Sequence, residues 1–277
     1  MGVVSGLSGA VNGKSTVRKW SISYTADTQA FVASNTKLGT GRLAGNKDWS
    51  GAYEGYGHTP DAIPGAEFTF TGSIDGTKGV AGTAIVDTVE IVIDIESGGI
   101  ISHTVSFSAN GALTEGAAAA VDASLPAVYT AIGCKVEVSD VLAEVAYADL
   151  PDVRTITISM TASNASYVSS DTGGETKRVA GNLDVTIAVS LYTNDPSTSP
   201  IPAVNAHQFI RCYVNSTEYW EFLAVLTGEH SDVEVDIEGA AITGLTLNFG
   251  MSGWYDLDGT ITEGEINTPA LATVWPV

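Results

Sequence analysis

Short stretches in which apolar and polar residues alternate recur along the chain. Clear examples are residues 20–24 (Trp-Ser-Ile-Ser-Tyr), 104–107 (Thr-Val-Ser-Phe) and 155–160 (Thr-Ile-Thr-Ile-Ser-Met). Successive side chains of a strand point to opposite faces, so this alternation predicts strands with one buried face. The dipeptides at 110–111 (Asn-Gly) and 258–259 (Asp-Gly) are typical of tight hairpin turns. We therefore expect a mainly β protein.

One stretch, residues 139–150, has a helical pattern instead. Ser139 and Asp140 are typical N-cap residues, and apolar residues follow at helical spacing as far as Ala148. A residue that precedes proline disfavours the helical conformation, so the helix is expected to end before Pro151. The sequence thus predicts one short helix here.

The chain contains two copies of one sequence unit. An offset of 136 aligns residues 17–49 with 153–185 without a gap, and 15 of the 33 pairs are identical. Unrelated sequences would share roughly two. Residues 94–96 (Asp-Ile-Glu) match 236–238 at an offset of 142, and a third block follows at an offset of 148. The two increases of six residues predict two short insertions at loops of the second copy.

This repeat predicts how the chain is organised. We expect an N-terminal arm (1–16), a first domain (17–116), a connecting segment (117–152), a second domain (153–264) and a C-terminal tail (265–277). Each copy has the size of a small independent domain, so two similar β-sandwich or barrel domains in tandem are expected, each with at most a short helix. The Gly- and Ser-rich arm is expected to become ordered only on assembly.

The charge balance changes which partners can be considered. The chain has 32 acidic and 12 basic residues, a formal net charge of −20 and a pI of about 4.2. Proteins that bind nucleic acids or anionic lipids do so through clusters of Lys and Arg, so this composition argues against both functions. A hydrophobic fraction of 44% argues against general disorder. No run of 18 apolar residues is present, so no membrane partner is expected.

The sequence offers little catalytic chemistry. Its four histidines have no metal-ligand spacing with one another or with a cysteine, and no Gly-x-Ser-x-Gly nucleophile motif is present. Cys134 and Cys212 are expected to be small buried thiols. We therefore predict no catalytic residue, no cofactor, no metal site and no enzymatic activity.

One charged pattern recurs in both copies of the repeat. Acidic residues alternate with aliphatic ones, a spacing that puts carboxylates on one face of a strand and Ile or Val side chains on the other. The carboxylates belong to Asp94, Glu96, Asp236 and Glu238, and the aliphatic side chains to Ile93, Ile95, Val235 and Ile237. An ordinary solvated sheet face would have the same pattern. The presence of paired like charges in both copies favours a functional acidic face, because such charges repel one another.

A second pattern carries a resemblance to a known family. Residues 41–53 (Gly-Arg-Leu-Ala-Gly-Asn-Lys-Asp-Trp-Ser-Gly-Ala-Tyr) are followed by Pro60, by Pro-Gly at 64–65 and by Phe-Thr-Phe at 68–70. A degenerate copy of the first block occupies residues 177–184. Together these segments resemble the tail tube proteins of tailed bacteriophages. The motif positions found in both copies are Arg42, Gly45, Asn46, Asp48, Arg178, Gly181, Asn182 and Asp184.

The resemblance implies a fold and an assembly. In that family, packed sheets with a flanking helix and an extended hairpin form rings of six domains, and the stacked rings enclose a channel for DNA ejection. Two domains in one chain imply rings of three chains with pseudo-sixfold symmetry. Implied partners are further copies of the chain, the tape measure, the tail terminator, the baseplate or tip proteins, and DNA that passes without specific binding. The implied location is the virion tail, assembled in the host cytoplasm.

The charge of the chain agrees with such a conduit, because acidic walls repel DNA whereas basic walls hold it. Two other functions remain open. A capsid decoration or neck protein would also be acidic and rich in strands. A glycan-binding or adhesion module would need exposed aromatic side chains, although core or interface packing would account for these as well. The candidates are Trp49, Tyr53, Tyr56, Trp220, Trp254 and Tyr255.

Overall fold

The architecture is taken from a computed structural model of the chain. The structure describes residues 10–14, 16–33, 39–58, 60, 62–75, 78–117, 128–140, 146–192, 201–216, 218–227, 244–251 and 271–272. Asp236, Glu238, the expected turn at 258–259, Trp254 and Tyr255 lie outside these ranges.

The described residues form a mainly β protein, as predicted. Fourteen strands belong to one antiparallel sheet. Its strands in the first half of the chain are β1 (Ala10–Val11), β2 (Val17–Phe31), β3 (Gly41–Tyr56), β4 (Glu67–Ser73), β5 (Lys78–Asp94) and β6 (Ser102–Ala117). Those in the second half are β7 (Val136–Asp140), β8 (Ala148–Asp149), β9 (Val153–Ala162), β12 (Leu183–Leu191), β13 (His207–Tyr213), β14 (Tyr219–Leu226), β15 (Leu245–Met251) and β16 (Leu271–Ala272).

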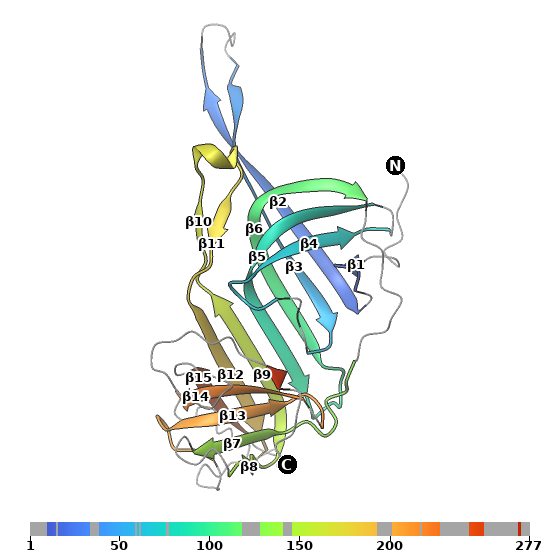
Figure 1. Ribbon diagram of the computed structural model, residues 1–277, viewed down its shortest axis with the longest axis vertical. Coiled ribbons are helices and arrows are strands. Elements are labelled where there is room, and N and C mark those ends of the chain that lie inside the picture. The colour runs from blue at the N-terminus through green and yellow to red at the C-terminus, as the bar shows by residue number, and fades with distance from the viewer. Residues whose placement is uncertain are drawn as a thin grey trace, which may run out of the picture.

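A separate two-stranded ribbon extends from the second half. It consists of β10 (Ala165–Tyr167) and β11 (Lys177–Val179), which pair antiparallel around a short 3-10 turn, η3 (Ser170–Thr172). In Figure 1 this ribbon lies beside the longer β2–β3 hairpin, which projects beyond it at the top of the view. The two hairpins are equivalent in sequence, because both belong to the block repeated at an offset of 136.

The halves of the chain share one continuous sheet. Its main order is β2-β3-β6-β5-β9-β12-β15-β14-β13-β7-β8, with β4 paired to β5 and β1 to β4. The halves therefore meet where β5 pairs with β9 (Figure 1). The structure differs here from the expected arrangement of two separate β-domains, because no break in pairing divides the halves.

The repeat is nevertheless present in the pairing register. In the β2–β3 hairpin Tyr24 lies opposite Trp49, and in the β9–β12 pair their counterparts Met160 and Val185 lie opposite each other. The next strands, β6 and β15, and then β5 and β14, β4 and β13, and β1 and β7, follow in the same order. The duplicated sequence thus builds one set of strand pairings twice.

The core of the first half is aromatic. Phe107 contacts the rings of Trp49 and Phe70 at centroid distances of 6.1 and 4.8 Å. The ring of Trp20 from β2 lies 5.9 Å from that of Phe70 from β4, so the sheet of the first half bends until β2 and β4 pack against each other. Trp49, Phe70 and Phe107 are at most 1% exposed. Burial of these large side chains provides the main hydrophobic stabilisation of this half.

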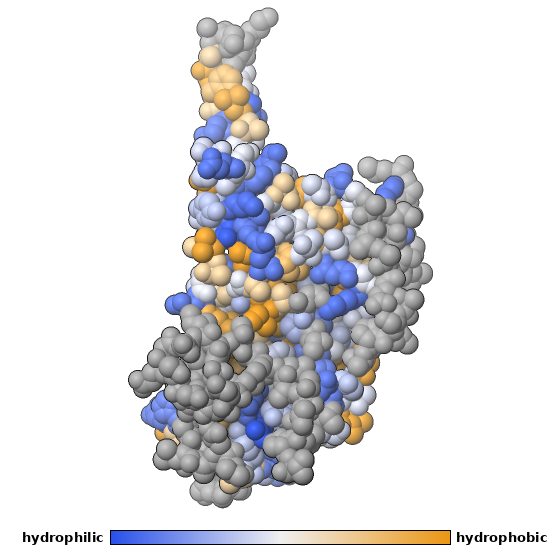
Figure 2. All heavy atoms as spheres, in the orientation of Figure 1, coloured by the Kyte–Doolittle hydropathy of each residue, from blue (hydrophilic) through white to orange (hydrophobic). Residues whose placement is uncertain are grey.

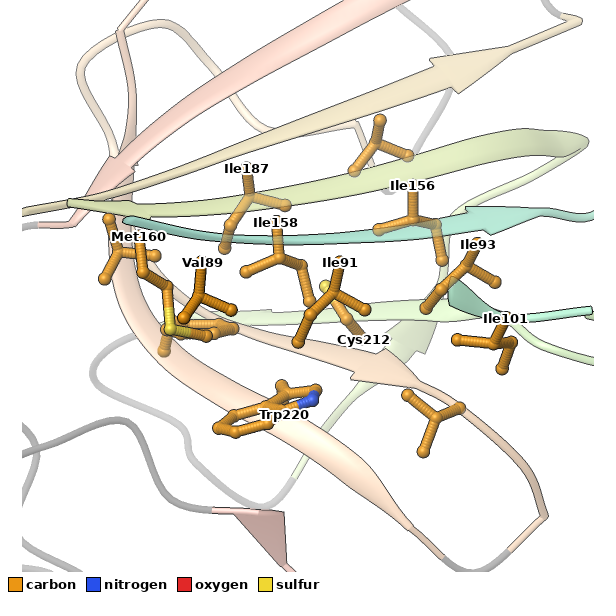
Figure 3. Close-up of a cluster of buried hydrophobic side chains, with 14 of the residues drawn as sticks. Val89, Ile91, Ile93, Ile101, Ile156, Ile158, Met160, Ile187, Cys212 and Trp220 are labelled. Carbon is orange, nitrogen blue, oxygen red and sulfur yellow. The ribbon is translucent and has the colours of Figure 1, made fainter. Parts of the chain in front are cut away.

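The core of the second half is mostly aliphatic. Figure 3 shows Ile158 and Ile187 from β9 and β12 next to Ile91 from β5, with Cys212 and Trp220 approaching from β13 and β14. All five side chains are buried. The first half therefore contributes β5 to the core of the second, which joins the two cores into a single hydrophobic cluster.

Two sequence predictions are wrong in detail. The dipeptide at 110–111 is not a hairpin turn but lies within β6, where the β5–β6 register shifts and Gly111 has a φ of 138°. That bulge lets the Gly111 carbonyl accept a hydrogen bond of 2.8 Å from Trp49 Nε1. Ser139 and Asp140 do not start a helix, because they belong to β7, which pairs with β13. Residues 141–145 lie outside the described part of the chain.

The segments outside the repeat also contribute strands. Ala10 and Val11 form β1, are fully buried and pair with β4, and Asn12 Oδ1 accepts a hydrogen bond from Thr71 N. This part of the N-terminal arm is therefore ordered within the chain, contrary to the expectation that it orders only on assembly. In the connecting segment, β7 takes the same place against β13 that β1 takes against β4.

Candidate assembly face and repeat junction

One face of the sheet is lined mainly by short hydroxyl side chains, and we call it the hydroxyl face. It extends from β2 across β3, β6, β5, β9 and β12 to β15, so it includes both halves. Its hydroxyl residues are Ser21, Ser23, Thr25, Ser50, Thr104, Ser106, Ser108, Thr88, Thr155, Thr157, Ser159, Thr161, Thr186, Ser190 and Thr246. These residues are exposed or half-buried, whereas the residues between them along β9 and β12 are buried.

The strand register shows that these side chains share one face. One row runs from Thr104 through Glu90 and Ser159 to Thr186, each directly opposite the next in the neighbouring strand. Residues opposite each other in antiparallel strands project to the same side. This face was not among the sequence predictions, although Ser or Thr stands at every second position from residue 155 to residue 161. The result is a polar surface of short side chains that crosses the boundary between the halves.

Carboxylates lie within this face. Glu90 is exposed, Asp94 is half-buried, and Glu54 lies 3.5 Å from the ammonium group of Lys19. Asp94 Oδ1 accepts a hydrogen bond of 3.1 Å from Ser97 N, and hydrogen bonds with Ser97 hold the pKa of Asp94 below its ordinary value. Asp94 is thus placed on the open face, opposite Thr155, with Ile93 buried behind it.

Glu96 has a different role from the one expected. Strand β5 ends at Asp94, so Glu96 lies in the turn that follows rather than on the strand face. Its Oε2 accepts hydrogen bonds from Arg154 Nη2 at 2.8 Å and Nε at 3.1 Å. The hydrogen bond from Arg154 lowers the pKa of Glu96, and the same contact raises the pKa of Arg154. Glu96 therefore joins the two halves electrostatically.

We call the boundary between the halves the repeat junction. Its centre is the β5–β9 pairing, in which Val89, Ile91 and Ile93 lie opposite residues of β9. Beyond Asp94 the amides of Ile95 and Glu96 both donate to the carbonyl of Arg154. Backbone pairing of this kind fixes both the distance and the register between the two halves.

The β10–β11 ribbon extends the repeat junction along β3. Lys47 N donates to Gly174 O at 2.8 Å, and Thr176 N donates to Lys47 O at 3.0 Å. Arg178 forms a two-pronged ion pair with Asp48, with Nη1–Oδ1 at 3.0 Å and Nη2–Oδ2 at 2.7 Å. The Arg178 side chain is 13% exposed and that of Asp48 37%. Paired hydrogen bonds between a guanidinium and a carboxylate are strong and fix orientation.

The structure places the duplicated motif at this junction and at the bends of the two hairpins. A Cβ on Gly45 would lie 2.9 Å from Asp27 O, and one on Gly181 would collide with the equivalent Ser163 O, so both positions require glycine. Asn182 O accepts a hydrogen bond from Ser163 N. Asn46 is exposed. Asp48 and Arg178 pair with each other, whereas Arg42 and Asp184 are exposed and lie apart from this pair.

Apolar side chains are exposed on both hairpins. On the β2–β3 hairpin these are Phe31, Val32 and Leu43, and Figure 2 shows apolar residues gathered on this projection. The equivalent positions of the second copy are again apolar and exposed: Tyr167, Val168 and Val179. Exposed apolar patches are typical of surfaces that contact other molecules.

The aromatic residues considered for glycan binding are mostly buried. Trp49, Tyr53 and Trp220 are at most 4% exposed, and the Tyr56 ring is covered by the guanidinium of Arg18 at 5.1 Å. Burial raises the pKa of the Cys134 thiol to about 11 and also raises that of Cys212. The part of the chain that the structure describes contains no group of three or more His, Cys, Asp or Glu placed to hold a metal ion.

No helix among the described residues has the length and apolar character needed to cross a membrane. Comparison of the chain with protein-family models and with curated protein sequences finds no match.

Proposed function

We propose that the protein is a structural subunit that assembles head to tail into rings, and that stacked rings form a tube like that of a bacteriophage tail. The repeat junction carries this proposal. Two equivalent halves lie side by side with their strands paired, and the first half uses β5 in this contact whereas the second uses β9. Each half therefore has two different binding surfaces, one of the β5 type and one of the β9 type. A contact between two different sides propagates from copy to copy, and it forms a ring where its rotation closes.

The proposed ring contains three chains. Each chain supplies two tube domains, built around residues 17–116 and 153–264, so three chains give six near-equivalent units. The same strand order in both halves supports this pseudo-sixfold arrangement, because equivalent units can repeat one contact around the ring.

The hydroxyl face is proposed to line the channel of the tube. Its short side chains project little, and Glu90 and Asp94 repel a polyanion. DNA binds proteins mainly through cations that release its counterions, so a face without a cluster of Lys or Arg would let it slide. The face crosses the repeat junction without interruption, as the wall of a continuous channel must.

The wider setting belongs to the same proposal. The subunit would act in the virion tail after assembly in the host cytoplasm, without enzymatic activity. Its partners there would be further copies of itself, the tape measure, the tail terminator, and baseplate or tip proteins. A decoration or neck protein would share the acidic composition but would not need the hydroxyl face to be continuous from one half to the next.

Electron microscopy of the purified protein over a range of concentrations tests the proposal. We expect rings or tubes with an open channel and six units around each ring. A protein that remains monomeric at every concentration and salt condition, or rings with twelve lining units, would contradict it.

Retention of DNA by assembled tubes tests whether the hydroxyl face lines the channel. Tubes of Glu90→Lys/Asp94→Lys should retain a labelled DNA duplex at low salt and release it at high salt, whereas wild-type tubes should not retain it. Glu115→Lys, an exposed strand residue outside the hydroxyl face, is a matched control. Equal retention by the control and the double variant would place these carboxylates outside the channel.

A further inference from the structure

The ion pairs of the repeat junction join residues that are identical in both copies. Arg178 of the second copy binds Asp48 of the first, and it also donates from Nη1 to Ala109 O at 2.6 Å. At an offset of 136, Arg178 corresponds to Arg42 and Asp48 corresponds to Asp184. The chain therefore has a second arginine and a second aspartate at equivalent positions: Arg42 in the first copy and Asp184 in the second.

The second arginine and aspartate have no partner among the described residues. Arg42 of β3 and Asp184 of β12 are both exposed, and neither side chain forms a hydrogen bond or ion pair with another residue that the structure describes. Within one chain, Arg42 is at the outer side of the first copy and Asp184 is on the second copy. One junction is complete within the chain, and the two residues of a second ion pair are exposed separately, Arg42 on the first copy and Asp184 on the second.

Another arginine shows the same contrast. Arg154 lies over the ring of Tyr192 at 4.6 Å and binds Glu96 across the repeat junction. Its counterpart Arg18 lies over Tyr56 at 5.1 Å, and position 56 corresponds to position 192. Arg18 has no carboxylate partner among the described residues. The aromatic platform and the guanidinium are thus present in both copies, and only the carboxylate is missing from the first.

The edge strand β2 is left open in the same way. Its counterpart β9 has a neighbour on both sides, β5 and β12, whereas β2 pairs, among the described strands, only with β3. Tyr24 of β2 is 50% exposed, and the equivalent Met160 of β9 is fully buried opposite Val89. A strand of 15 residues with a free edge is prone to pair with another chain. No described strand therefore occupies at β2 the position that β5 occupies at β9.

We propose that the first copy of one chain binds the second copy of another chain in the geometry of the repeat junction, with Arg42 of one on Asp184 of the other. This inference rests on the proposed ring and names the residues that close it. Arg42 takes the place of Arg178, and Asp184 that of Asp48. In the same contact, Thr40 takes the place of Thr176, which donates its backbone N–H and its hydroxyl to Lys47 O. The Lys47 counterpart is Leu183.

The occupant is a second copy of this chain because the two surfaces complement each other in charge and in shape. The first copy offers Arg18 and Arg42 on the β2–β3 hairpin, and the second copy offers Asp184 at the start of β12, opposite Thr161. The repeat junction shows that one surface of each type binds the other. A contact of this kind uses different surfaces on the two chains, so it continues head to tail.

Charge reversal tests the pairing. Arg42→Asp and Asp184→Arg should each raise the protein concentration needed for assembly by about tenfold or more, because a desolvated ion pair is replaced by repulsion. The double variant Arg42→Asp/Asp184→Arg should recover most of that loss, since it restores opposite charges in every contact. Lys78→Asp and Glu115→Arg make the same changes of charge at exposed strand positions and should assemble like the wild type.

The outcomes separate this pairing from the proposed function. Wild-type rings together with normal assembly of both single variants would refute the pairing and leave the ring intact. The pairing would also be refuted if the single variants fail to assemble and the double variant fails to the same extent although circular dichroism shows it to be folded. If the wild type forms no ring at all, the proposed function fails first and the pairing with it.

An equimolar mixture of the two single variants gives an independent check. Each contact between unlike chains restores opposite charges, and each contact between like chains does not. Alternating chains cannot close a ring of three without one contact between like chains. Recovery by the double variant but not by the mixture supports a three-chain ring with this pairing, whereas complete rings from the mixture would contradict three chains.

Discussion

The two halves of the molecule build the same strand order from cores of different composition. In the first half, Trp49 packs above Gly82, where an added Cβ would lie 2.6 Å from the indole. Val86 lies opposite Phe107, and Leu226 lies opposite the Phe107 counterpart Phe249, so Gly82 corresponds by strand register to Phe222. The positions equivalent to Trp49 and Gly82 thus carry a smaller and a larger residue, Val185 and Phe222, and both are buried. The large side chain is thus on β3 in the first half and on β14 in the second, while the pairing register of the strands is the same.

A second pair of positions follows the same rule. Gly51 in the first half leaves room for Phe107, because a Cβ there would lie 2.6 Å from the Phe107 ring. In the second half Ile187 occupies the equivalent position, opposite Phe249. Cores tolerate such exchanges when the total volume and the apolar pattern are kept. The comparison of the halves shows that backbone pairing fixes the strand register, whereas the side chains of each core pack in their own way.

Removal of a matched phenylalanine from each half should show the largest difference between them. Phe107→Ala should cost about 4–5 kcal/mol of unfolding free energy, because Phe107 contacts four aromatic rings. Phe249→Ala should cost about 3 kcal/mol, since Phe249 forms no ring contact with the described residues. Urea unfolding of both variants measures the two costs. Equal costs would show that the aromatic cluster adds nothing beyond its burial.

Exchange of volumes between the halves should have the next largest effect. Gly82→Phe alone overpacks the first core against Trp49 and should cost about 1–3 kcal/mol or more. Trp49→Val/Gly82→Phe recreates the residues of the second half and should be more stable than the sum of its single changes predicts. The recovery will be partial, because Gly111 O loses its hydrogen bond from Trp49 Nε1. Strictly additive costs would show that the two positions do not share one space.

Much of this arrangement can be predicted from the sequence. Alternation gives the strands at 20–24, 104–107 and 155–160, and all three lie in strands of the structure. The duplication also identifies Arg42, Asp48, Arg178 and Asp184 as positions of interest, because identity between the copies persists where the cores have diverged.

The rest depends on contacts that the sequence does not encode locally. Ala10 and Val11 are too few to show a period, and they are held by the edge of β4. The helical pattern from Ser139 loses to pairing with β13, which supplies backbone partners over five residues. Glu96 keeps strand phase in the sequence, but the turn after Asp94 directs it to Arg154.

The hydroxyl face shows the same limit at larger scale. Single strands with Ser and Thr on one side are ordinary solvated strands when considered one at a time. Only the register from β2 to β15 reveals that these sides join into one surface across both halves. The strand pattern is therefore local, whereas the candidate site exists only after the halves are paired.

The smallest expected effect concerns the contact between the halves at His58. This side chain follows β3 in the first half, is 4% exposed, and its Nε2 lies 3.4 Å from Glu218 Oε2 in the second half. Burial lowers the pKa of His58 below its ordinary value of 6.5, a shift that the charge of Glu218 partly opposes. The folded protein therefore favours the neutral imidazole.

The sign of the pH dependence follows from linkage. Below about pH 6.5 the unfolded chain takes up a proton at His58 more readily than the folded chain does, so stability falls as the pH decreases towards the folded pKa. Above that range the contribution of His58 is complete. The lowered pKa values of Asp94 and Glu96 act in a separate, more acidic range. His58→Phe, which can still stack on Tyr129, should flatten the dependence of Tm on pH between 7.5 and 5.5.

Glu218→Gln should act in the opposite direction from His58→Phe. Loss of the Glu218 charge lowers the His58 pKa further, so the fall in stability should extend to lower pH than in the wild type. Thermal unfolding of the three proteins at matched salt separates the cases. If His58→Phe keeps the wild-type slope, the pH dependence arises from groups other than His58, and the contact at His58 does not contribute to it.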